Sequence, residues 1–238
     1  MINPITDDHF YPESWYPSNT PLNLEKWTVP ACQACNRKKA KLDDYAFMIL
    51  VPGLQTSSEA YEDIRARHRR AIDVNSATNL KDAVKRRQRG FALLSTFKQH
   101  LWADPRRIVP THVQPPLNKG EPFNVVQFDG ARVREQFLYM LKGLAHVLHG
   151  GLLVDGAMIA RVDFFDKAVV IDQAKPYLQN VRVENFDRGP GFQGQYVCST
   201  WEEKPVFFCG VTIWEYFYFY GLLGQGVPHL VDVQWTQR

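Results

Sequence analysis

The chain has 238 residues, of which 45% are apolar and 22% are charged, and its formal net charge is +3. These values are ordinary for a globular protein with a buried core. The longest apolar runs are too short to cross a bilayer, and the first ten residues lack the basic and apolar regions of a secretory signal. No membrane span or secretory signal is visible, so we expect a cytoplasmic protein without a membrane partner.

The first fifty residues predict short strands followed by a helix. Prolines at positions 12, 17, 21 and 30 leave room only for short extended segments. EKWTV at 25–29 alternates in the way that a strand does. From Gln33, the sequence QACNRKKAKLDDYAFMIL predicts a helix that ends before Pro52-Gly53.

Residues 57–103 predict two helices. Ser57 or Ser58 is expected to cap the first, and Asn79 the second. The second helix carries apolar side chains at roughly helical intervals; they are Leu80, Val84, Phe91, Leu94 and Phe97. The proline-rich residues 103–122 predict an irregular, ordered connection.

Basic residues are concentrated in these two helices. Nine Lys or Arg residues lie between Arg65 and Arg89, against two acidic residues. Such a cluster can attract the phosphates of a nucleic acid, although a solvated helix face explains it equally well. The candidate contacts are Arg65, Arg67, Arg69, Arg70, Lys85, Arg86, Arg87 and Arg89.

The last third of the chain predicts one long helix and then a sheet. ARVREQFLYMLKGLAHVLHGG at 131–151 has one broad apolar face and ends at two glycines. Alternating β-branched and aromatic residues then predict antiparallel strands; the stretches are 160–172, 180–185, 194–200, 204–220 and 229–236. The expected fold class is α+β, with parts at 1–52, 53–120 and 121–238.

The beginning of the chain also carries residues suited to phosphodiester hydrolysis. Asp8 offers a hard carboxylate oxygen and Asn36 a neutral carbonyl oxygen, which suit Mg²⁺ or a similar ion. In an extended segment His9 points away from Asp8, so its imidazole stays free to act as a general base. Asp7 is the second choice for the role of Asp8.

The segment DHFYPESWYP…WTVPACQACNRKKAKLDDY resembles the HNH endonucleases over about residues 6–45. The resemblance implies an N-terminal ββα-metal core and a phosphodiester hydrolase that acts on DNA more than on RNA. It implies that His9 is the general base and that Asn23 orients the His9 loop. Asp8 and Asn36 would bind Mg²⁺ or Mn²⁺, and Lys39 would contact phosphate or pack on the helix surface.

Cys32 and Cys35 supply only two of the four ligands that a structural zinc requires. Relatives with this motif usually carry another Cys-x-x-Cys upstream, whereas no cysteine precedes Asp7 here. Three explanations stay open: the sequence starts late, the core has lost zinc and packs both thiols as small apolar groups, or Cys198 and Cys209 complete the site. Otherwise Cys198 and Cys209 are ordinary strand residues.

Two further hypotheses stand beside the enzyme. The chain is a non-catalytic nucleic-acid-binding or adaptor protein on an HNH-like scaffold, or a nuclease that acts only with a protein partner.

Several other motifs favour structural roles: Asp43 and Asp44 as solvated helix acids, His146 and His149 at a helix end, RGPGFQGQ at 188–195 without a Walker lysine, and WEYFYFYG as a core strand.

Overall fold

The computed structural model describes residues 5–54, 59–100, 123–126, 129–149, 158–163, 182–189, 191–201, 204–215 and 217–224. These residues form helices and antiparallel sheets, which confirms the predicted α+β class. The predicted connection at 103–122 and the predicted strand at 229–236 lie outside the described residues.

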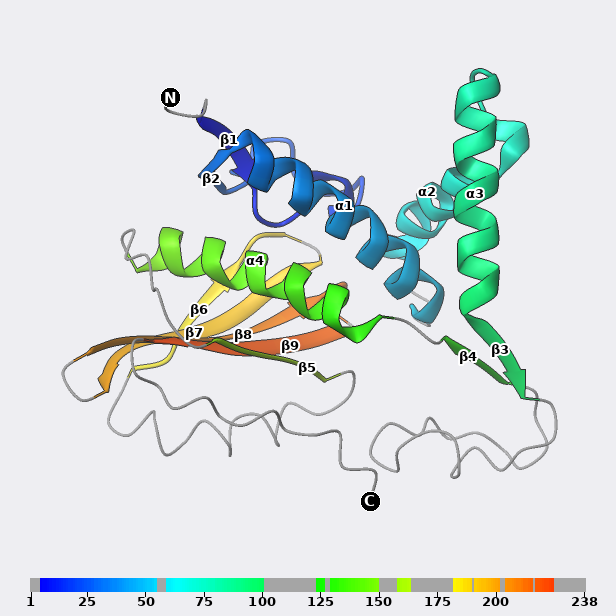
Figure 1. Ribbon diagram of the computed structural model, residues 1–238. Coiled ribbons are helices and arrows are strands. Elements are labelled where there is room, and N and C mark those ends of the chain that lie inside the picture. Colours follow the sequence, from blue (N-terminus) through cyan, green and yellow to red (C-terminus); the bar gives the residue numbers. More distant parts are fainter. Residues whose placement is uncertain are drawn as a thin grey trace.

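The chain begins with a strand, a second strand and a helix (Figure 1). Strand β1 (Ile5–His9) pairs antiparallel with β2 (Thr28–Cys32), so that Asp8 lies opposite Val29. Helix α1 (Gln33–Leu50) follows directly and has the predicted bounds. The predicted strand at 25–29 is displaced to 28–32.

Two helices and a small sheet follow. Helix α2 (Glu62–Ile72) and helix α3 (Leu80–Thr96) confirm the two predicted helices. Strand β3 (Phe97–His100) continues from α3 and pairs antiparallel with β4 (Phe123–Val126). One-turn helices also occur, at Glu13–Trp15, Val51–Gly53, Glu59–Tyr61 and Val74–Ser76.

Helix α3 does not bury the apolar face that its sequence pattern suggests. The buried residue is Leu93, which packs in a small cluster with Met48 and Ile49 of α1. The face of the predicted apolar residues is exposed instead; Leu80, Val84, Phe91 and Leu94 keep 81%, 48%, 60% and 67% of their surface. The helix packs through the opposite side because that side meets α1 and α2.

The rest of the chain packs a helix on a sheet. Helix α4 (Gly130–Leu148) lies over one face of the sheet, with α1 above it (Figure 1). The sheet is antiparallel in the order β5-β9-β8-β7-β6; the strands are β5 (Met158–Asp163), β6 (Glu184–Asp187), β7 (Phe192–Trp201), β8 (Lys204–Ile213) and β9 (Phe217–Gly224). Phe137 of α4 stacks on Phe219 of β9 at 4.3 Å between ring centroids.

The apolar run at 204–220 forms two strands and a turn, not one strand. Trp214 and Glu215 adopt φ angles of 51° and 57° and reverse the chain between β8 and β9. Tight hairpins need this left-handed backbone at their central residues, and Asn-Gly or Asp-Gly usually supplies it. The turn is therefore invisible in a sequence that places a tryptophan there.

One hydrophobic cluster joins the two ends of the described chain. Phe10, Tyr11 and Trp15, from the loop after β1, are buried with residues of the sheet. The Tyr11 hydroxyl donates to the Gly191 carbonyl at 3.1 Å, and the Trp214 indole donates to the Trp15 carbonyl at 2.8 Å. The predicted parts 1–52 and 121–238 thus share a core.

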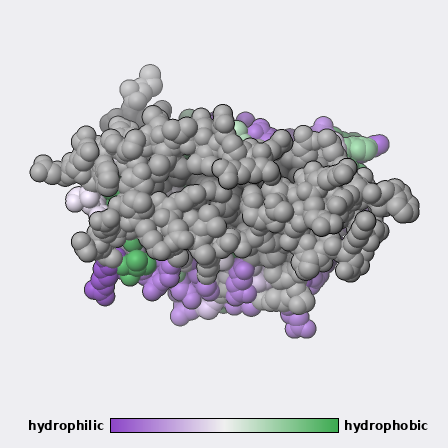
Figure 2. All heavy atoms as spheres, turned by 90° about the horizontal axis from the view of Figure 1, so that it is seen from below, coloured by the Kyte–Doolittle hydropathy of each residue, from purple (hydrophilic) through white to green (hydrophobic). Residues whose placement is uncertain are grey.

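Seen from below, the coloured atoms along one edge of the molecule are mostly hydrophilic, beside a small apolar patch (Figure 2). Among the described residues, every helix is too short or too polar to span a lipid bilayer.

Candidate metal site at the strand–helix corner

The start of α1 lies against β1. Asn36 is the fourth residue of the helix, and its side-chain nitrogen donates to the Thr6 hydroxyl at 3.2 Å. Thr6 and Asp8 are two residues apart on β1, so their side chains share a face of the strand. The structure therefore brings the predicted ligands Asp8 and Asn36 to the same side of β1, from positions distant in the chain.

The N-cap of α1 is Cys32 rather than Asn36. The Cys32 sulfur accepts a hydrogen bond from the Cys35 backbone N–H at 3.4 Å. Because the N-cap position is already filled, the amide of Asn36 is not needed to cap the start of the helix. Its nitrogen bonds Thr6, which leaves its oxygen available as an acceptor or ligand.

Lys39 links this corner together from the inside. It is 3% exposed, and its ammonium donates to the His9 carbonyl and to Asp43 Oδ2, each at 2.7 Å. Asp8 Oδ1 lies 3.8 Å from the same ammonium. Lys39 thus holds the interior of the fold and does not lie on the surface, where a phosphate would reach it.

Asp43 completes a buried polar network. Its second oxygen accepts a hydrogen bond from Gln136, which is fully buried on α4. Burial raises the pKa of Asp43 to about 6, although Lys39 and Gln136 favour its charged form. The expectation that Asp43 is a solvated acid is thus corrected, whereas Asp44 is exposed and pairs with Arg89 at 2.9 Å.

The raised pKa of Asp43 predicts a specific pH dependence of stability. The ordinary value is 3.8, so between about pH 4 and 6 the folded chain binds the proton more tightly than the unfolded chain does. The stabilisation that Asp43 contributes is complete below the ordinary pKa of 3.8, and it is lost as the pH rises through the folded-state pKa of about 6. Relative to Asp43→Asn, we expect the wild-type free energy of unfolding to fall by roughly 2 to 3 kcal/mol across this window. Urea unfolding at a series of pH values measures it, and parallel curves for the two proteins would contradict it.

Asp8 sits at the edge of the network. Burial raises its pKa, and the charges of Lys39 and His9 act in the opposite direction. Its carboxylate is 14% exposed, and its contact with Lys39 is longer than the contact between Lys39 and Asp43. The lysine is therefore held mainly by Asp43, and Asp8 keeps oxygen lone pairs that Lys39 does not use.

His9 ends β1 and is half-buried. Its Nδ1 is buried and has no hydrogen-bond partner among the described residues. The hydrogen bond and charge of Lys26 lower the pKa of Glu13, and the charge of His9 adds a smaller effect, so the imidazole lies near that carboxylate as well as near Asp8. Asn23, predicted to orient the His9 loop, is exposed between β1 and β2, and no hydrogen bond joins the two among the described residues.

The donor chemistry of Asp8 and Asn36 fits a Mg²⁺-class ion. Such ions are held by one or two protein oxygens, and water and substrate phosphate complete the shell. Asp7 is exposed and alternates to the other side of β1, so it remains second to Asp8. Within the described ranges no group of three or more His, Cys, Asp or Glu side chains is arranged to hold a metal.

Cys32 and Cys35 lie together at the start of α1. Hydrogen bonds from Cys35 lower the pKa of Cys32, and the pKa of Cys35 is raised because its thiol donates to Cys32. All four cysteines are free thiols. Cys209 is fully buried and Cys198 half-buried on neighbouring strands of the large sheet, away from the strand–helix corner.

We expect the two motif cysteines to react with thiol reagents before the sheet cysteines do. Cys35 is exposed and Cys32 is half-buried, whereas burial raises the pKa of Cys209 well above its usual range. In the native protein, iodoacetamide should label Cys32 and Cys35 roughly tenfold or more faster than Cys209. Peptide mass spectrometry gives the rates, and comparable labelling of Cys209 would contradict the prediction.

Most of the predicted nucleic-acid contacts have partners within the protein. Arg67 donates to the carbonyls of Ser14 and Tyr16 at 2.6 and 2.5 Å and pairs with Asp63 at 2.6 Å, which ties α2 to the loop after β1. The other ion pairs are Arg65 and Arg69 with Glu62, Arg86 with Asp82, and Arg89 with Asp44. Arg67 and Arg89 therefore join separate elements, whereas the pairs of Arg65, Arg69 and Arg86 lie within one helix.

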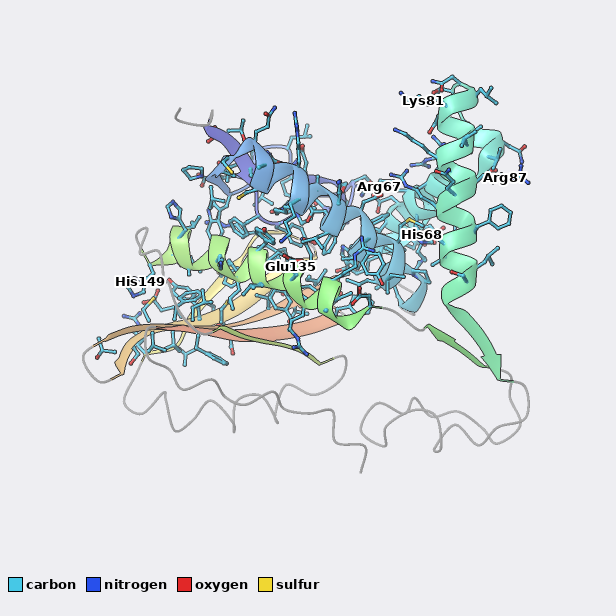
Figure 3. All side chains as sticks on the ribbon, in the orientation of Figure 1. Arg67, His68, Lys81, Arg87, Glu135 and His149 are labelled. Carbon is cyan, nitrogen blue, oxygen red and sulfur yellow. The ribbon has the colours of Figure 1, made fainter. Side chains whose placement is uncertain are left out.

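Three of the predicted basic contacts are exposed and have no acidic partner within α2 and α3. They are Arg70, Lys85 and Arg87. Figure 3 shows Arg87 on the outer side of α3 and Lys81 in the first turn of that helix. If nucleic acid binds to these helices, this outer side carries the cations that it meets.

The network residues Asp43 and Gln136 were not predicted. Lys39 and Asp43 are four residues apart on one helix, a spacing that joins opposite charges. That pattern is visible in the sequence, but their burial is not, because α4 covers the pair from a distant part of the chain.

A scan against protein-family models, a search of curated proteins and a search of solved structures each found no match to this chain.

Proposed function

We propose that the chain is a metal-dependent HNH-type endonuclease that hydrolyses phosphodiester bonds in DNA. The proposal starts from the resemblance of residues 6–45 to that family. The observation that carries it is the hydrogen bond from Asn36 to Thr6, on the face of β1 that also carries Asp8. An amide and a carboxylate near each other are the pair that such a hydrolase needs.

Each residue has a defined task in this mechanism. Asp8 and Asn36 would hold Mg²⁺ or Mn²⁺, which when bound neutralises charge on the scissile phosphate. His9 accepts the proton of the attacking water, a task suited to an imidazole near neutral pH. Lys39 fixes the backbone of His9 through the carbonyl bond at 2.7 Å and positions the end of β1.

Substrate binding falls to the exposed cations of the central helices. Arg70, Lys85 and Arg87 are the candidates, since the other arginines are engaged in ion pairs. Their number is small, so the contribution of α2 and α3 to DNA affinity should be modest and should weaken with salt.

A second candidate function is a non-catalytic nucleic-acid-binding or adaptor protein. The observation in its favour is the ammonium of Lys39 at 3.8 Å from Asp8. A built-in cation beside the carboxylate already neutralises part of its charge, as expected if the core is kept as a scaffold.

A plasmid assay separates the two functions. Purified protein is incubated with supercoiled DNA and Mg²⁺, Mn²⁺ or EDTA, and Mn²⁺ binding is measured in parallel by electron paramagnetic resonance. Nicking with either metal, absent in EDTA and in Asp8→Ala, supports the nuclease. DNA binding with neither nicking nor Asp8-dependent Mn²⁺ binding would favour the scaffold. Asp8-dependent Mn²⁺ binding without nicking would indicate that a partner protein is needed.

A further inference from the structure

Helix α3 carries an apolar stripe that faces outward. Leu80, Val84, Phe91 and Leu94 keep between 48% and 81% of their surface exposed. At about 100° per residue, the four lie within an arc of about 80° and extend over about 21 Å of helix. A continuous apolar face of this length on an exposed helix is typical of helix-to-helix recognition.

The opposite side of α3 accounts for its packing within the protein. Leu93 is buried against α1, Arg89 pairs with Asp44 of α1, and Arg86 bonds the Arg70 carbonyl of α2. The stripe is therefore not required to hold α3 in place. Among the residues of the chain that the structure describes, none buries it.

The charges beside the stripe are all positive. Arg87 lies within the stripe and Lys81 follows its edge; both are exposed, and Arg87 lies over the Phe91 ring at 5.5 Å (Figure 3). The acid of this helix, Asp82, is bound to Arg86 on the inner side. A partner that covers the stripe must offer apolar side chains and opposing negative charge.

A second copy of the chain meets these requirements poorly. In an antiparallel pair of α3 helices, Arg87 lies midway between Leu80 and Leu94 and would face Arg87 of the other copy. A parallel pair would also align like charges. Phosphates would satisfy the lysines and arginines but would leave the apolar side chains in contact with water.

We propose that the outer face of α3 binds an amphipathic helix of a partner protein whose apolar seam is flanked by Glu or Asp. The partner's apolar residues cover Leu80, Val84, Phe91 and Leu94, and its acidic residues pair with Lys81 and Arg87. This surface is separate from the strand–helix corner, so the proposal does not depend on nuclease activity. Arg87 is also one of the proposed DNA contacts, so the partner and DNA would compete for it.

The test uses a synthetic probe. A labelled helical peptide of about four heptads carries Leu at positions a and d and Glu at e and g, and its twin carries Lys in place of Glu. Fluorescence anisotropy should detect binding of the Glu peptide to the full-length protein. The Lys peptide should bind at least tenfold more weakly. Lys81→Glu together with Arg87→Glu should reduce or reverse this preference.

Matched variants locate the binding face. The double variant Phe91→Ser, Leu94→Ser should weaken binding of the Glu peptide at least tenfold. Leu22→Ser, which alters a fully exposed leucine elsewhere, should leave this binding unchanged. Circular dichroism checks that each variant is folded. Absence of binding, equal binding by the double serine variant, or preference for the Lys peptide would overturn the proposal. So would a dimer in sedimentation that the double variant abolishes, because it would assign the face to a second copy.

Discussion

Replacing His9 by alanine is expected to lower the rate of DNA cleavage by about 100-fold to 10,000-fold, the usual contribution of a general base. The imidazole is the group near Asp8 that can accept a proton at neutral pH, since burial and ion pairing engage Lys39 and Asp43. The change removes a half-buried side chain at the end of β1, whose Nδ1 has no hydrogen-bond partner among the described residues. We therefore expect nearly unchanged stability and DNA affinity.

The rate is measured by plasmid nicking under single-turnover conditions, and DNA affinity by fluorescence anisotropy. Asp7→Ala is the matched control, because it alters the exposed neighbour of Asp8 and should keep most of the activity. Equal nicking by His9→Ala and wild type would remove His9 from the mechanism. Loss of activity in Asp7→Ala but not in Asp8→Ala would exchange the roles of the two acids.

Replacing Lys39 by methionine should destabilise the fold by about 3 to 5 kcal/mol, because the loss of one partner leaves the other buried charge uncompensated. The ammonium is 3% exposed and bonds Asp43 and the His9 carbonyl, each at 2.7 Å. Methionine fills a similar volume but donates no hydrogen bond. Among the described residues, Asp43 then keeps the side-chain hydrogen bond from Gln136.

Urea unfolding at pH 7.5 measures this loss, and Lys38→Met is the control. Lys38 is the adjacent residue and pairs with Glu135 across α1 and α4, but its side chain is 59% exposed. A pair of this kind contributes about 0 to 1 kcal/mol. Adding Asp43→Asn to Lys39→Met should recover part of the lost stability. Equal effects of the two lysine variants would show that burial of Lys39 does not matter.

The helices could be predicted from the sequence because their patterns are local. The run from Gln33 to Leu50 gave a helix with the observed bounds, since Cys32 caps its start and Pro52 follows its end. In the sequence, Gly150-Gly151 follow α4 after one residue, His149, and the helix begins one residue before the expected start. Periodicity and breaker residues act over a few positions, so no distant contact is needed to find them.

The sequence also indicated the α+β class and the antiparallel sheet, through alternating β-branched and aromatic residues. It did not indicate the turn at Trp214 and Glu215. Their left-handed backbone is supported by packing, because Trp214 is fully buried and its indole bonds the Trp15 carbonyl. A residue nearly two hundred positions away therefore helps to fix a local conformation.

Residue types alone suggested Asp8, His9 and Asn36 as a group, but only the tertiary structure decides what stands around them. Packing of α1 against β1 brings Asn36 to Thr6, and packing of α4 on α1 buries Asp43 beneath Gln136. The same packing decides that α3 turns Leu93 inward and its longer apolar stripe outward. Sequence patterns thus determined which segments form helices and strands, whereas which face of each is buried depended on neighbours distant in the chain, because burial is a property of the assembled core.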